Sequence, residues 1–74
     1  MGRLQILNGN VEEKYSWSPN SPAETRIARE KFEYCMKQGF IACKIVKKGE
    51  PGIQITEFDP EAEEIFILGL ADGG

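Results

Sequence analysis

Hydrophobic and polar residues alternate along the first part of the chain in the pattern of a β-hairpin. The alternation begins over residues 4–7 and resumes over residues 11–17, and the intervening Asn8-Gly9 strongly favours a two-residue hairpin turn. Glu13 shares a face with the apolar residues of the second segment. We therefore predict two antiparallel strands whose inward face is only partly covered near the turn.

A helix is predicted to begin at Ser21. This serine can cap the helix, Pro22 suits the first helical position, and Glu24 stands where a capping box places its reciprocal acceptor. The residues that then recur at mostly helical spacing are Ala23, Ile27, Ala28, Phe32, Cys35 and Met36. We interpret this apolar stripe as core. Gly39 is expected to take the left-handed conformation that ends the helix, with Phe40 packing back onto the last turn.

Further strands follow the helix. The nearly continuous apolar run at residues 40–46 predicts a strand well covered by the helix. Residues 49–52 have the composition of a turn. A fourth strand is expected over Ile53 and Ile55, with an extension to Phe58 left open.

A last strand is predicted over residues 64–70, after Pro60, which cannot donate to a sheet. The resulting order of two strands, a helix and three strands predicts an α+β fold. A β-grasp is the simplest closure: one helix packs on a mixed sheet of four to five strands, and the helix supplies the crossover that lets the first and last strands pair in parallel. Residues 1–70 are therefore expected to form one domain, followed by a tail at 71–74.

Composition and charge exclude several classes of function. The chain has 74 residues with 12 acidic and 9 basic side chains, a net charge of -3, which disfavours nucleic acid and membrane surfaces as partners. The chain start lacks the apolar core of a signal peptide, and no segment is long and apolar enough to span a membrane. We therefore expect a cytoplasmic protein.

Catalytic and metal chemistry are not expected. The chain has no histidine, which removes the ordinary zinc site and the Cys-His nucleophile, and its small size leaves little room for a deep pocket. Cys35 and Cys43 are interpreted as buried structural thiols. The expectation is a protein that is not an enzyme and needs no cofactor or metal.

Gly73 and Gly74 are the last two residues of the sequence, directly after the last predicted strand and its short polar continuation. Because glycine has no Cβ, two glycines form a thread narrow enough to carry a terminal carboxylate into another protein's active site. A frayed chain end or a cloning remnant would also place glycines there.

Acidic residues are concentrated at the approach to the last strand. They are Glu57, Asp59, Glu61, Glu63 and Glu64. Such a group forms either a solvated loop or a surface that steers the domain onto a basic partner. Leu70, beside the tail, belongs to the same candidate partner-binding set. Tyr15 and Trp17 are interpreted as closing the end of the core rather than as an exposed contact patch.

The element order, together with the segment from Glu64 to Gly74, resembles the ubiquitin-like proteins, which include the sulfur carriers of thiamine biosynthesis and the small subunit of molybdopterin synthase. The resemblance implies that an activating enzyme adenylates the carboxylate of Gly74, to which Gly73 gives passage. The activated end would then be transferred to a target protein or converted to a thiocarboxylate. Gly69-Leu70 replaces the proline pair usual in the molybdopterin-synthase subunit, which favours a protein modifier over a sulfur carrier.

A second class of function does not need the diglycine. A non-covalent binding or assembly module, such as a small accessory protein of bacterial or phage origin, would offer a sheet edge or the acidic loop to a partner.

Overall fold

The computed structural model describes residues 2–47 and 49–69 of the chain. Within these ranges the elements are β1 (Gly2–Asn8), β2 (Val11–Trp17), α1 (Pro22–Lys37), β3 (Ile41–Ile45), β4 (Ile53–Ile55) and β5 (Glu64–Leu68). The predicted order of elements and the α+β class are confirmed.

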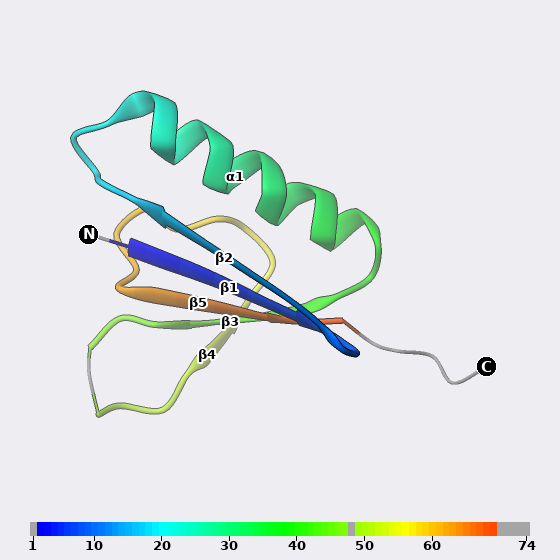
Figure 1. The fold of residues 1–74 in the computed structure, drawn as a ribbon. Helices are drawn as coiled ribbons and strands as arrows, with labels where there is room; N and C mark the ends of the chain where they lie inside the picture. The colour runs from blue at the N-terminus through cyan, green and yellow to red at the C-terminus, as the bar shows by residue number, and fades with distance from the viewer. Residues whose placement is uncertain (1, 48, 70–74) are drawn as a thin grey trace.

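The strands of the described residues form one mixed sheet in the order β2-β1-β5-β3-β4. β1 and β5 lie side by side in parallel, with Leu4 opposite Ile65, whereas the other neighbours are antiparallel. The predicted parallel pairing of these two segments is therefore confirmed. α1 connects the β1–β2 hairpin to β3 and lies across one face of the sheet (Figure 1). The arrangement is compatible with a β-grasp-like fold.

The hydrophobic core lies between α1 and the sheet. Its buried residues are Leu4, Ile6, Trp17, Ala28, Phe32, Cys35, Ala42, Ala62, Ile65 and Ile67. Trp17 is fully buried, packs its ring 5.0 Å from that of Phe58, and donates its indole N–H to the carbonyl oxygen of Pro60 at 3.1 Å. Burial of a large apolar side chain contributes about 1.5–3 kcal/mol. Trp17 thus closes one end of the core, as predicted.

The start of α1 is capped in a way that differs from the predicted capping box. The Ser21 hydroxyl accepts the N–H of Glu24 at 3.3 Å, as expected. The Glu24 carboxylate, however, accepts the N–H of Ser18 at 2.9 Å instead of that of Ser21. The Ser21 N–H is already bonded to the carbonyl oxygen of Ser18 at 2.9 Å, so the glutamate closes the preceding turn.

The buried stripe of α1 is narrower than predicted. Ala28, Phe32 and Cys35 are buried, but Ala23 is exposed and Ile27 is 52% exposed. With 3.6 residues per turn, Ile27 lies roughly 100° around the helix from Ala28 and Ala23 roughly 140° from it. The placement of Ala23 and Ile27 in the core stripe was therefore wrong.

The end of α1 follows the prediction. Gly39 has φ +85°, the left-handed conformation that a residue with a Cβ rarely adopts, and Phe40 packs against the core. α1 is neither long nor apolar enough to cross a membrane, and the structure contains no other helix within the described ranges.

The three strands after the helix differ in part from what the sequence predicted. β4 ends at Ile55, and Phe58 lies in the following loop with its ring directed to the core, so it does not extend the strand. β3 is less well covered than expected, because Ile41 is 37% exposed and only Ala42 within the strand is buried. β5 ends at Leu68, two residues before the predicted end, and Leu70 lies outside the described residues.

Candidate functional site

The residues expected to carry the activation chemistry, Gly73 and Gly74, lie outside the described part of the chain, as does Leu70. The structure does describe the point from which that segment continues. Gly69 donates its N–H to the carbonyl oxygen of Leu7 at 2.7 Å, which extends the β1–β5 pairing by one hydrogen bond beyond Leu68. The chain therefore leaves the sheet beside the β1–β2 turn.

Gly69 is tightly enclosed at this point. A Cβ at Gly69 would lie 2.5 Å from the side-chain oxygen of Asn8, closer than non-bonded atoms approach one another. Asn8 is the last residue of β1, so the exit of β5 is packed directly against the end of β1. Glycine at position 69 permits this close approach.

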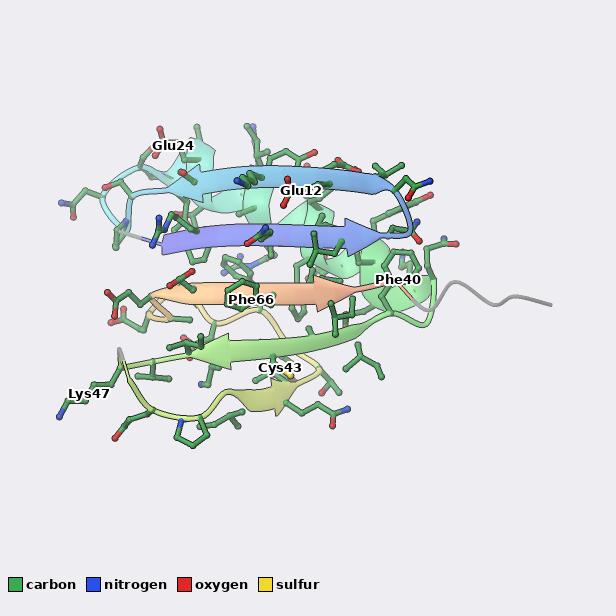
Figure 2. The ribbon with its side chains drawn as sticks, turned by 60° about the horizontal axis from the view of Figure 1, so that its bottom comes forward. Glu12, Glu24, Phe40, Cys43, Lys47 and Phe66 are labelled. Carbon is green, nitrogen blue, oxygen red and sulfur yellow. The ribbon has the colours of Figure 1, made fainter. Side chains whose placement is uncertain are left out.

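The sheet face away from α1 carries an apolar cluster that we call the open-face patch. It consists of Leu7, Ile41, Cys43, Ile45, Phe66 and Leu68. Leu68 pairs with Leu7 on one side and with Ile41 on the other, so these three side chains lie in one row across the sheet. Phe66 and Cys43 lie on this same face (Figure 2).

The open-face patch is well exposed. Leu7 is 36%, Ile41 37% and Leu68 48% exposed, although each is a large aliphatic residue. Contiguous exposed apolar side chains mark interaction surfaces more often than isolated ones do. The row of Leu7, Leu68 and Ile41 lies at the end of β5 from which the chain continues toward residue 70.

Polar contacts occupy the rest of the same face. The Arg3 guanidinium lies 3.5 Å from the Glu64 carboxylate, and Gln5 donates to Glu12 at 2.6 Å. These polar contacts lie on β1 and β2 and reach Glu64 at the start of β5, whereas Leu7 at the end of β1 belongs to the open-face patch. A partner that covers the open-face patch would meet charged groups along one border.

The five residues of the predicted acidic group differ in environment. Glu64 faces Arg3, and Asp59 accepts a hydrogen bond from Lys44 at 2.5 Å. The bond from Lys44, helped by the backbone N–H of Glu61, lowers the pKa of the Asp59 carboxyl. Glu57, Glu61 and Glu63 are exposed. Two of the five acidic side chains therefore meet basic partners of the fold itself, and the other three face solvent.

The two sheet edges are β2 and β4. β2 is joined to α1 through Glu13, which accepts from Tyr15 at 2.7 Å and lies 3.2 Å from the Lys31 ammonium. The Tyr15 hydroxyl and then Lys31 lower the pKa of the Glu13 carboxyl. These contacts explain how the fold tolerates the carboxylate of Glu13 on the face of β2 that points toward α1.

The two cysteines differ in environment. Cys35 is 2% exposed, and burial raises the pKa of its thiol. Cys43 is only half-buried, on the open face, so the prediction of two buried structural thiols was wrong for Cys43. The reason is that β3 has no covering layer on that side among the described residues. Within the same residues no group of three or more Cys, Asp or Glu side chains is arranged to hold a metal ion.

Sequence reasoning did not identify the open-face patch. The signal was present in the apolar runs 40–46 and 65–68, where both alternating sets of residues are hydrophobic except at Lys44. We interpreted the first run as a strand covered by the helix, but a single helix covers only one face of the sheet. The second set of residues in each run is therefore available to a partner.

Comparison of the chain with protein-family models, with curated proteins and with solved structures finds no match.

Proposed function

We propose that this protein is a ubiquitin-like carrier with a β-grasp fold whose Gly74 carboxylate is activated by an adenylating enzyme. The observation that supports the proposal is the central parallel pair of β1 and β5 in a sheet crossed by α1. This arrangement brings the chain out of the sheet at Gly69, next to the open-face patch, and only a few residues separate that point from the diglycine.

The proposed chemistry uses ATP and a second enzyme. The Gly74 carboxylate attacks the α-phosphorus of ATP, which forms an acyl adenylate and releases pyrophosphate. A thiolate of the activating enzyme then displaces AMP to give a thioester, and an amine of the target protein displaces that thiol to give an amide. In the sulfur-carrier version, hydrosulfide displaces AMP from the acyl adenylate and leaves a thiocarboxylate. The carrier domain itself contributes binding surface and no catalytic group.

The open-face patch fits a docking role in this scheme. An enzyme that acts on the tail must hold the domain close to residue 69, and the row formed by Leu7, Leu68 and Ile41 lies there. Apolar surface that a partner removes from water contributes roughly 25 cal/mol per Å² to the free energy of binding. We propose that the activating enzyme covers this row.

The experiment compares the full chain with a variant that lacks Gly73 and Gly74, each with an N-terminal tag and expressed in cells of the source organism. The intact mass establishes whether the mature chain ends at Gly74. The proposal predicts conjugates that survive denaturant and reducing agent, or a C-terminal thiocarboxylate detected by mass. Both products must be absent from the shortened variant. Equal conjugation of the two chains would exclude the carrier function.

A second candidate is a non-covalent binding module, and the exposure of Leu7, Ile41 and Leu68 favours it because this surface does not require the diglycine. The variant Leu68→Ser separates the two functions. A module keeps its partner after deletion of Gly73 and Gly74 and loses it in Leu68→Ser, without any covalent product from the full chain. A carrier loses its covalent products when the diglycine is deleted.

A further inference from the structure

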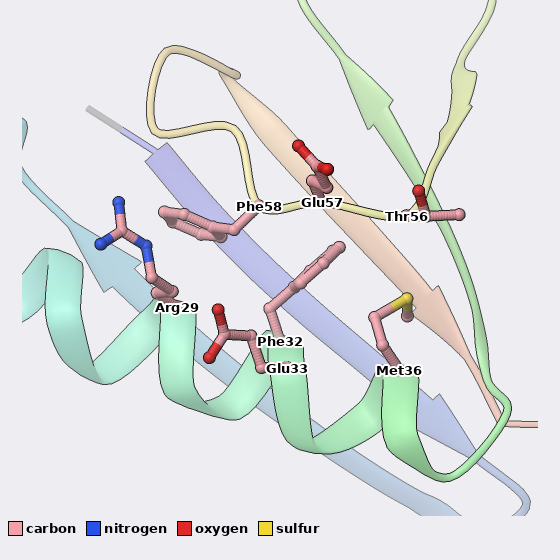
Figure 3. Close-up of a pocket in the computed structure, with 7 residues that line it drawn as sticks. All are labelled: Arg29, Phe32, Glu33, Met36, Thr56, Glu57 and Phe58. Atoms are coloured by element: carbon pink, nitrogen blue, oxygen red, sulfur yellow. The ribbon is translucent and has the colours of Figure 1, made fainter.

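A pocket of about 410 Å³ lies on the helix side of the molecule, away from the open-face patch. We call it the helix–loop pocket. Its walls are formed by Arg29, Phe32, Glu33 and Met36 of α1 and by residues 56–58 of the loop after β4 (Figure 3). A volume of this size falls within the range of small-ligand and side-chain pockets.

The interior of the helix–loop pocket is apolar and aromatic. Phe32 is fully buried and its ring lies 5.9 Å from that of Phe58, while Met36, farther along α1, is half-buried. A thioether side chain adapts its shape readily to an inserted group. These surfaces are suited to receive an apolar side chain.

The charges at the rim indicate what flanks that side chain. Glu33 stands on the helix wall and Glu57 on the loop wall (Figure 3), and neither forms an ion pair within the described ranges. Arg29, the basic residue of the lining, already lies 5.7 Å from the centre of the Phe58 ring. The rim therefore presents two free carboxylates on opposite walls, in a chain whose net charge is -3.

We propose that the helix–loop pocket binds a segment of a partner protein in which an apolar side chain is flanked by lysine or arginine. The apolar side chain contacts the accessible surfaces of Met36 and Phe58, beneath which the Phe32 ring is buried, and the flanking cations pair with Glu33 and Glu57. This site is independent of the proposed carrier function, because it involves neither the open face nor the tail.

The test uses three capped pentapeptides with the central sequences Lys-Leu-Lys, Lys-Ala-Lys and Glu-Leu-Glu, titrated into the isotope-labelled protein. Amide resonances in residues 29–36 and 56–58 report on the pocket. The proposal predicts saturable shifts there with Lys-Leu-Lys and clearly weaker ones with the other two peptides. No saturable shift at these residues, equal shifts with Glu-Leu-Glu, or saturation on the open face alone would overturn it.

Matched variants test the role of the rim. Glu33→Gln with Glu57→Gln is expected to weaken binding of Lys-Leu-Lys roughly two- to thirtyfold, since two exposed ion pairs are lost. Glu30→Gln with Glu50→Gln removes the same charge at exposed positions outside the pocket and must leave binding unchanged. Equal effects of the two double variants would show that only net charge matters and would contradict the site.

Discussion

Gly2 packs directly against the indole ring of Trp17, its partner across β1 and β2. A Cβ at Gly2 would lie 2.1 Å from Cζ2 of Trp17, so the ring occupies the space of a side chain at position 2. Trp17 is also held from the other side by its bond to Pro60 and by the Phe58 ring. Glycine is therefore needed at the first position of β1, because the Trp17 ring fills the space that a side chain there would occupy.

Gly2→Ala should destabilise the protein by about 1–3 kcal/mol, the usual range for overpacking a filled site. Urea unfolding followed by tryptophan fluorescence measures the change. Gly52→Ala is the control, because a Cβ there meets its nearest atoms at an ordinary 3.6 Å. Similar stabilities for Gly2→Ala and Gly52→Ala would show that Trp17 moves aside freely.

Ser21→Ala should lower the free energy of unfolding by about 1 kcal/mol, because the N–H of Glu24 loses its side-chain acceptor. Ser21→Asp retains an acceptor at the cap and should stay close to the original stability. Thermal unfolding of the three proteins measures the difference. If Ser21→Asp is destabilised as much as Ser21→Ala, the cap is not the source of the effect.

Asp59 should make stability depend on pH in the acid range. Lys44 lowers the pKa of Asp59 below its ordinary value of 3.8, so the contribution of this pair is complete above that value and is lost as the pH falls through the lower, folded-state pKa. Asp59→Asn should therefore lower the free energy of unfolding near neutral pH. The difference in unfolding free energy between this variant and the original protein should become smaller as the solution is acidified. Urea midpoints measured across this range test the prediction.

The control for Asp59 is Glu63→Gln, since Glu63 is exposed and forms no ion pair within the described residues. The difference in urea midpoint between Glu63→Gln and the original protein should be the same at every pH. A constant difference between Asp59→Asn and the original protein would mean that the Lys44 pair contributes nothing that depends on protonation.

Cys43 should react with a thiol reagent in the folded protein much faster than Cys35. Cys43 is half-buried on the open face, whereas Cys35 is 2% exposed and has a pKa raised by burial. A timed reaction with an aromatic disulfide should show a fast phase that disappears in Cys43→Ser and persists in Cys35→Ala. Fast reaction of Cys35 would mean that α1 opens readily from the sheet.

Much of the fold could be predicted because local signals and topology agreed. Asn8-Gly9 indicated the hairpin, but the two turn residues are Gly9 and Asn10, because Asn8 still pairs with Val11 at the end of β1. Ser21 marked the helix start, and the helix supplies the crossover that the parallel pair of β1 and β5 requires. The partner of the Glu24 carboxylate could not be predicted, because it depends on how residues 18–21 turn before the helix begins.

The candidate surfaces were harder to predict than the fold. Hydrophobicity on both faces of a strand does not tell whether the second face meets another layer of the same chain or a partner, and Ile41 and Phe66 were therefore missed. The helix–loop pocket depends on Phe58 leaving the strand pattern and turning to Phe32, a contact between segments far apart in the chain.

The parallel pair of β1 and β5 also determines when a growing chain can fold. Leu4 leaves the ribosome long before Ile65, its neighbour in the sheet. The apolar faces of the hairpin and of α1 therefore stay exposed until residues 64–68 have been synthesised. Contacts between such distant segments form slowly and leave the nascent chain open to aggregation. A product that stops before residue 64 is therefore expected to be a client of chaperones and proteases rather than a smaller folded protein.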